Sequence, residues 1–215
     1  RELLPLRTGG SGIDDAPKVL DHLDEQMLGF IERSPFLQLG TADEDGLPFV
    51  SPKGDHPGFV YVKDPRTLII PDRPGNSILM GLQNLLANPK AGLCFEIPGN
   101  PTTLRVGGKV ALSNDPQILA QMPARGLDAM LAIVLQIDYA FFHCAKAYMR
   151  SKLWEPDSWP EEMYPVGFGI YFTETAEEAA EMDAGTKATY GMVAAAVDGN
   201  GVEISTRADA QRTDA

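Results

Sequence analysis

Short segments with strand character follow one another closely between residues 36 and 112, and this spacing limits the folds open to the chain. Turns rich in Pro, Gly, Asp and Asn separate the segments, which cover residues 36–42, 47–53, 59–62, 67–70, 91–97 and 103–112. One internal helix is predicted among them, from Asn76 to about Asn88. Closely spaced strands with a single helix favour an antiparallel barrel over a parallel α/β sheet. The dinucleotide-binding motif G-x-G-x-x-G is absent.

Helical periodicity outside these strands predicts three further helices. Apolar residues spaced at helical intervals predict one over Lys18–Ile31, which Ser34-Pro35 would end. A second helix is predicted over residues 115–130, followed by a strand over 132–140. The Ala-, Glu- and Asp-rich end of the chain predicts one more helix, Ala176–Met182.

Composition and charge narrow the class of protein. The net charge of −12 argues against nucleic acid as a partner. No apolar run is long enough to span a bilayer, and the first residues lack a signal-peptide pattern, so we expect no membrane association and a cytoplasmic location. Two cysteines and three widely separated histidines match no disulfide framework or metal site, so no metal is expected.

Charge and composition also divide the chain. Residues 1–17 are expected to form an N-terminal arm, residues 18–160 the main domain, and residues 161–215 an acidic and partly irregular extension. Residues 46–112 hold seven Lys or Arg against four Asp or Glu, whereas residues 156–215 hold three against twelve. A mildly basic centre within an acidic protein fits a site for a small anion, although an acidic end can equally be a solvated surface.

The segment that joins the strand at Leu68–Ile70 to the following helix predicts an anion site. A helix that begins at Asn76 or Ser77 would present unpaired N–H groups and a partial positive charge, and Arg73 lies close by in the sequence. Together they would suit a phosphate group. The alternative is a strand-to-helix turn in which Asn76 only caps the helix and Arg73 pairs with Asp72 or Asp55.

A series of short motifs runs through most of the chain in a fixed order. It comprises Ser34-Pro35-Phe36, Thr41-Ala42-Asp43, Ser51-Pro52-Lys53-Gly54-Asp55, Ile70-Pro71-Asp72-Arg73-Pro74-Gly75-Asn76, Leu93-Cys94-Phe95-Glu96, Thr103-Leu104-Arg105-Val106-Gly107-Gly108 and His143-Cys144-Ala145-Lys146-Ala147. The order and spacing resemble the pyridoxamine 5′-phosphate oxidase-related flavoproteins, from about Leu20 to Trp159.

This resemblance implies a fold class and an assembly. The fold would be mainly β with flanking helices, a six-stranded antiparallel split β-barrel of the FMN-binding type. The protein would be a homodimer with two FMN molecules at the interface, each held mainly by one subunit. The strand Val50–Lys53 would run along the flavin ring, the turn Pro71–Ser77 would hold the phosphate, and the second subunit would contribute from Thr102–Val106.

The resemblance also implies a set of cofactor-binding residues. They are Val50, Ser51, Lys53, Pro71, Asp72, Arg73, Gly75, Asn76, Ser77, Thr103, Arg105, His143 and Lys146. Alternatives remain open for several of them. Lys53 could bind the phosphate, face an anionic substrate or be solvated, and Arg105 could touch FMN across the interface or pair with an acid. His143 and Lys146 could approach the flavin from the partner chain, or they could be a buried, hydrogen-bonded histidine beside a solvated lysine.

The function expected from these observations is an FMN-dependent oxidoreductase that acts on an unidentified small molecule. No catalytic residue can be assigned from the sequence. The chain departs from pyridoxamine phosphate oxidases at its C-terminus, because the tryptophan- and arginine-bearing end of those enzymes is replaced by an Ala/Glu/Asp-rich segment. That departure motivates one alternative, a flavin-binding module without turnover. A further alternative keeps the barrel with a deazaflavin or haem.

Overall fold

The computed structural model describes residues 19–73, 78–122, 128–144, 146–162, 164 and 166–197. These residues form two compact units. The first unit holds the described residues from 19 to 158 and contains the sheet, and the second holds those from 159 to 197.

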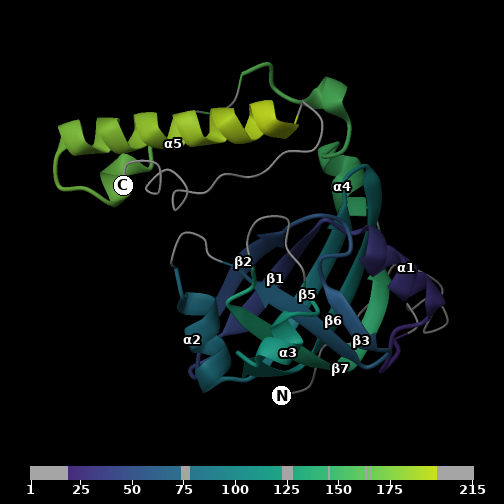
Figure 1. Cartoon of the computed structure of the whole chain (residues 1–215). Helices are drawn as coiled ribbons and strands as arrows, with labels where there is room; N and C mark the ends of the chain where they lie inside the picture. Colours follow the sequence, from purple (N-terminus) through teal and green to yellow (C-terminus); the bar gives the residue numbers. More distant parts are fainter. Residues whose placement is uncertain are drawn as a thin grey trace. The chain divides into compact units, whose positions relative to one another are not determined.

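The first unit is built on one antiparallel sheet that curls into a barrel (Figure 1). Its seven strands are β1 (Phe36–Ala42), β2 (Pro48–Gly54), β3 (Tyr61–Asp64), β4 (Thr67–Asp72), β5 (Lys90–Ile97), β6 (Asn100–Ser113) and β7 (Leu131–His143). The strand order is β2-β1-β5-β6-β7-β4-β3, so β2 and β3 are the two ends of the sheet. The expected class, a mainly β split barrel with flanking helices, is confirmed.

The strand count differs from the six expected, because β7 belongs to the sheet. It pairs with β6 along one side and with β4 along the other. β7 also continues past the predicted end at Ala140, since Phe141 and Phe142 still pair with Arg105 and Leu104. The last strand of the described residues therefore lies inside the sheet, between β6 and β4.

Alternating apolar residues from the strands fill the barrel. Those with no more than 3% of their surface exposed include Leu37, Leu39, Leu68, Ile70, Leu93, Phe95, Leu104, Val106, Ile133, Leu135 and Ile137. Helix α1 adds Met27 and Ile31 to the same cluster. Because the inward residues alternate along each strand, the residues between them face the opposite side of the sheet.

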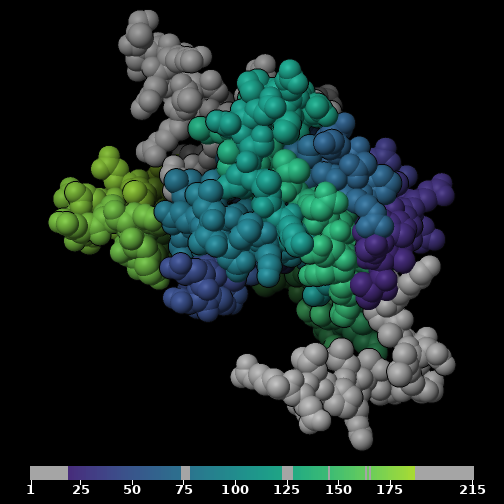
Figure 2. Space-filling model, turned by 90° about the horizontal axis from the view of Figure 1, so that it is seen from below, coloured from purple at the N-terminus to yellow at the C-terminus, as the bar shows by residue number. Residues whose placement is uncertain are grey.

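Helix α1 (Glu25–Arg33) begins later than the predicted Lys18–Ile31. The Asp24 carboxylate accepts a hydrogen bond from the Met27 N–H at 2.9 Å and so caps the helix. Leu20 instead forms an isolated bridge to Ala140 of β7, which takes the preceding residues out of the helix. Seen from below, α1 (purple) lies at one edge of the barrel unit (Figure 2).

The hairpin between β1 and β2 follows its predicted turn. Gly46 has a φ of +85°, which favours glycine, and the Asp43 carboxylate accepts hydrogen bonds from the N–H groups of Asp45 and Leu47. Among the described residues β2 pairs only with β1, so its other edge is open.

Two predicted helices are shorter in the structure. Helix α2 covers Met80–Ala87 rather than 76–88, and Leu79 at its N-cap position has non-helical backbone angles. Helix α3 covers only Pro116–Leu119, where the prediction ran to residue 130. The sequence has a proline at position 123, which disfavours a helical conformation in the residue before it.

The barrel unit ends in helix α4 (Lys146–Ser151) and a 3₁₀ turn, η2 (Pro156–Ser158). The second unit contains a 3₁₀ turn, η3 (Gly169–Tyr171), and helix α5 (Ala176–Val197). Helix α5 begins at the predicted residue but runs far beyond Met182. Thr175 and Glu178 form a reciprocal capping box at its start. No helix among the described residues is long and apolar enough to cross a membrane.

Candidate functional site

A cavity of about 760 Å³ opens where β2, β4 and the residues before α2 meet. Its polar lining comes from the ends of the two strands, including Ser51, Lys53, Asp72 and Arg73. Its apolar lining consists of Phe59, Ile78, Leu79, Leu82, Met130 and Leu131. A cavity with one charged wall and one apolar wall suits a ligand that is itself charged at one end and apolar at the other.

Two ion pairs hold the charged wall in place. Lys53 Nζ lies 2.5 Å from Asp72 Oδ1, and Arg73 Nε lies 2.7 Å from Asp55 Oδ2. All four side chains are at most about a quarter exposed. The pairing fixes the direction of both cations. An incoming anion would share these cations with the two carboxylates.

The helix next to the cavity does not supply the predicted N-terminus. Because α2 begins at Met80, the expected start at Asn76 or Ser77 is wrong, and Leu79 at the N-cap makes no side-chain capping bond. Gly75, Asn76 and Ser77 lie outside the described residues. Among the described residues, the charged lining of the cavity comes from Lys53 of β2, Asp72 of β4 and Arg73, which follows β4.

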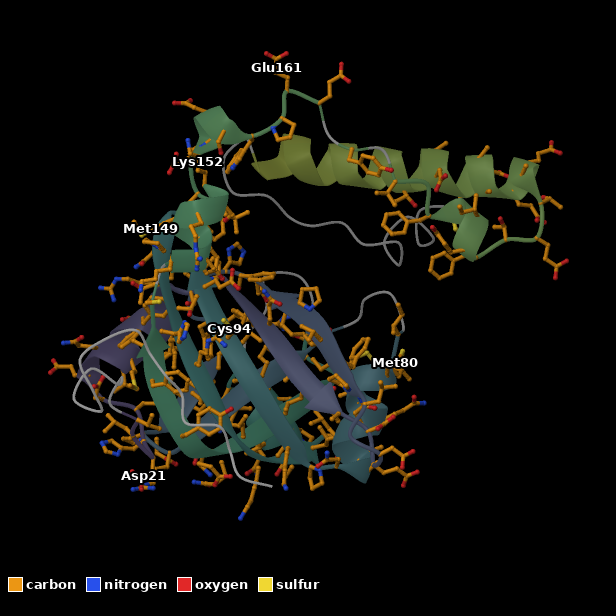
Figure 3. All side chains as sticks on the ribbon, turned by 180° about the vertical axis from the view of Figure 1, so that it is seen from behind. Asp21, Met80, Cys94, Met149, Lys152 and Glu161 are labelled. Carbon is orange, nitrogen blue, oxygen red and sulfur yellow. The ribbon has the colours of Figure 1, made fainter. Side chains whose placement is uncertain are left out.

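A second groove, of about 380 Å³, lies on the face of the sheet opposite the core. Its lining includes Gln38 of β1, Val50 of β2, Cys94 of β5, Arg105 of β6 and Tyr139 of β7. Arg105 is exposed. Cys94 lies midway along the curled sheet (Figure 3), and burial of the side chain raises the pKa of its thiol, which keeps the sulfur protonated.

A polar cluster borders the end of this groove. Glu96 is 6% exposed and accepts a hydrogen bond from Gln38 Nε2 at 3.0 Å. The Tyr148 hydroxyl also bonds to the Glu96 carboxylate, and desolvation together with that bond raises the pKa of Tyr148. The Tyr148 ring stacks on Trp154 with centroids 5.8 Å apart. The cluster thus fastens α4 to the sheet.

Comparison with protein families finds one family model that matches the chain. The family model described as pyridoxamine 5′-phosphate oxidase matches residues 23–144, which is more than half of the sequence. The chain belongs to the pyridoxamine 5′-phosphate oxidase family. The matched residues include all seven strands of the barrel, from the start of β1 at Phe36 to the end of β7 at His143. Among curated proteins, the comparison found no match.

Solved structures with a similar fold share little sequence with this oxidase-family chain. A putative pyridoxamine 5′-phosphate oxidase from Lactobacillus delbrueckii is 22% identical, covers 57% of this chain and 95% of its own, and gives a TM-score of 0.44. The haem storage protein HutZ from Vibrio cholerae is 16% identical, with coverages of 57% and 94% and a TM-score of 0.40. An F420 reductase is 20% identical, with coverages of 56% and 98% and a TM-score of 0.37.

The predicted cofactor residues fall into separate groups within one chain. Ser51, Lys53, Pro71, Asp72 and Arg73 line the first cavity, which brings together the predicted β2 strand and the predicted phosphate turn. The other described members lie elsewhere: Val50 and Arg105 line the second groove, Thr103 is buried in β6, His143 ends β7, and Lys146 begins α4.

Sequence reasoning missed several residues that shape the second groove. Gln38 and Glu96 belong to β1 and β5, and their contact joins positions 58 residues apart. Tyr139 lies across Gly107, since a Cβ at that glycine would be 2.3 Å from the Tyr139 ring. The one available signal was a charged residue, Glu96, within the otherwise apolar run from Ala91 to Ile97.

Proposed function

We propose that this chain is an FMN-binding flavoprotein that works as an oxidoreductase on a small molecule. The observation that carries the proposal is the first cavity, whose lining combines the cations Lys53 and Arg73 with apolar side chains, in a member of the pyridoxamine 5′-phosphate oxidase family. FMN has a dianionic phosphate at one end and a flat, largely apolar ring at the other. The phosphate would suit the charged lining residues of the cavity, and the ring would suit the apolar ones.

The cavity residues fit the cofactor chemically. Lys53 and Arg73 are the proposed phosphate partners, because a guanidinium and an ammonium both form charge-assisted bonds to phosphate oxygens. Asp72 and Asp55 aim these cations through the two ion pairs. We extend the proposed phosphate site to Pro71, Gly75, Asn76 and Ser77 on the family pattern.

Strand β2 is suited to a flat ligand beside it. It is an edge strand, and Pro48 and Pro52 lack the N–H group that a neighbouring strand would need. We propose that the backbone at Val50 and Ser51 faces the polar edge of the flavin ring. The flavin, once bound, supplies the redox chemistry, and the chain binds it, orients it and shields it from water.

The remaining predicted residues are proposed to act from a second copy. Thr103, Arg105, His143 and Lys146 do not line the first cavity of their own chain. In the proposed cytoplasmic homodimer, these residues complete the cofactor site of the partner.

The test is flavin binding by the full chain. We expect the purified protein, or the protein after addition of FMN, to show flavin absorbance and to quench FMN fluorescence on titration. Lys53→Gln and Arg73→Gln should each weaken FMN binding about tenfold or more, as expected for loss of a charge-assisted phosphate bond. Lys63→Gln, which removes an exposed charge from β3, is the matched control and should bind FMN normally.

A colourless protein that leaves FMN fluorescence unchanged would refute the proposal. A protein that binds FMN but oxidises neither NADH nor NADPH with any flavin-linked acceptor would retain the binding claim and remove the oxidoreductase claim. Mass spectrometry of the extracted chromophore would distinguish FMN from a deazaflavin.

A further inference from the structure

The second unit packs small residues inside and leaves large apolar side chains outside. Its turn η3 meets helix α5 at Gly169 and Ala179, which are both buried. A Cβ added at Gly169 would collide with the Ala179 backbone. The Asp183 carboxylate accepts a hydrogen bond from the Gly169 N–H at 2.7 Å, and the Thr173 hydroxyl donates one to the Gly169 carbonyl oxygen at 2.8 Å. Hydrogen bonds and close backbone contact therefore fix the turn on α5.

The large apolar residues around this turn form an exposed surface. Because a 3₁₀ turn has three residues per turn, Phe168 and Tyr171 lie on one side of η3, away from Gly169 and α5. Exposed apolar surface of this size is typical of an interaction site. We call the following six residues, each with at least 43% of its surface exposed, the aromatic face: Tyr164, Val166, Phe168, Ile170, Tyr171 and Phe172.

Acidic residues flank the aromatic face on both sides in the sequence. Residues 159–183 hold seven Asp or Glu and no Lys, Arg or His. Six of the seven are exposed glutamates, and Figure 3 shows the Glu161 carboxylate projecting into solvent. Glu177 and Glu181 are four residues apart on α5, so they lie on the same side of the helix. The aromatic face is therefore bordered by negative charge.

Charge decides which partner this surface suits. Nucleic acids and anionic membrane surfaces are themselves negative and would be repelled. A second copy of this chain is disfavoured for the same reason, because its own second unit is acidic and residues 19–158 hold twelve Lys or Arg against sixteen Asp or Glu. A protein surface that combines apolar side chains with positive charge is the complementary partner.

We propose that the aromatic face is a docking site for a basic amphipathic helix of another protein. Such a helix presents one apolar stripe, which would cover rings such as Tyr171 and Phe172, and Lys or Arg beside it, which would meet Glu177 and Glu181. Exposed aromatic side chains supply most of the affinity in many interfaces, and the charges at the rim guide the approach of the partner. The proposal uses no residue of the first cavity or of the sheet, so it holds whether or not FMN binds.

The test titrates the full chain into a fluorescently labelled probe, an amphipathic helix of Leu and Lys about 18 residues long, and follows fluorescence anisotropy. Two matched peptides control its chemistry. One has Glu in place of every Lys, and the other has the same composition in a scrambled order that leaves no apolar stripe. We expect the Leu/Lys helix to bind saturably and each matched peptide to bind about tenfold more weakly or worse. Binding should also weaken as salt is raised, because exposed charges are screened.

Variants of the chain locate the binding surface. Tyr171→Ser combined with Phe172→Ser removes two exposed rings and should weaken binding of the Leu/Lys helix about tenfold or more. Glu177→Gln combined with Glu181→Gln should weaken it about threefold and reduce its salt dependence.

Two further pairs of substitutions are the matched controls. Leu47→Ser combined with Leu86→Ser removes two similarly exposed apolar side chains from the barrel unit. Glu44→Gln combined with Asp45→Asn removes two exposed charges from the same unit. Both pairs should change probe binding less than about twofold. Circular dichroism and thermal unfolding check the fold of every variant.

The proposal is overturned if the Leu/Lys helix shows no saturable binding up to about 100 μM of the chain. Equal losses in the aromatic-face variants and in the controls would also overturn it, because the probe would then be attracted only by the net charge. So would an oligomer that Tyr171→Ser with Phe172→Ser dissociates in sedimentation without the probe, because the face would then join copies of this chain.

Discussion

Gly40, Gly92 and Gly107, which are paired across β1, β5 and β6, give a matched series for testing how Tyr139 packs. All three would gain the same methyl group if replaced by alanine, but the space differs. An added Cβ lies 3.5 Å from the nearest atom at Gly40 and 3.8 Å at Gly92, both ordinary contacts. At Gly107 it would lie 2.3 Å from Tyr139 Cζ, which no structure tolerates without movement.

The expected free energies follow from these distances. Gly40→Ala and Gly92→Ala should be neutral or stabilise the fold by up to about 1 kcal/mol, because alanine restricts the unfolded chain more than glycine does. Gly107→Ala should destabilise it by about 1–3 kcal/mol, since the Tyr139 ring must leave its place. Tyr139 is 41% exposed, so the ring can swing into solvent and the cost stays moderate.

The assay is urea unfolding of the four single variants and of the pair Gly107→Ala with Tyr139→Ala. Removing the ring should abolish most of the cost of the added methyl group, which would give a coupling energy of about 1 kcal/mol or more in the double-mutant cycle. The packing account is wrong if Gly107→Ala is as stable as Gly92→Ala, or if its cost persists in the Tyr139→Ala background.

Three further predictions concern other parts of the barrel unit. The hydrogen bond from His22, followed by that from Arg66, lowers the pKa of Asp21 to about 2. The ionised Asp21 carboxylate should therefore stabilise the fold above about pH 4, and this stabilisation should be lost as the pH falls toward 2. NMR titration of the Asp21 carboxyl measures its pKa, and a midpoint near 4 would contradict the prediction. The raised pKa of Tyr148 means that the fold favours its neutral form, so stability should fall as the pH rises above about 10, and Tyr148→Phe should remove that part of the alkaline loss in pH-dependent unfolding. Phe95→Ala, at a fully buried position, should cost about 3–5 kcal/mol in urea unfolding, and a loss below about 1 kcal/mol would mean that the core is described wrongly.

Local chemistry made part of the fold predictable from the sequence. The turn from Asp43 to Gly46 contains its own hydrogen-bonding carboxylate and a glycine suited to positive φ, so the β1–β2 hairpin was predicted within about one residue. The Ala-, Glu- and Asp-rich composition of the segment predicted a helix from Ala176, where α5 begins. Such signals depend only on neighbours in the chain.

Interactions between distant segments could not be predicted in this way. The start of α1 depends on the bridge between Leu20 and Ala140, which holds the preceding residues out of the helix. Likewise, the sequence left Arg73 with a choice between Asp72 and Asp55, and the structure pairs it with Asp55, 18 residues away. The packing of Tyr139 over Gly107 needs the register between β6 and β7, which no local pattern contains.

The open edge of β2 has a consequence for how the protein behaves at high concentration. An exposed strand edge is a template on which another molecule can add its own strand, and repeated addition leads to fibres. Pro48 and Pro52 interrupt that template, because each removes a donor from the row of backbone groups. The two prolines proposed to suit a flat ligand beside β2 would therefore also protect the barrel from polymerising through this side.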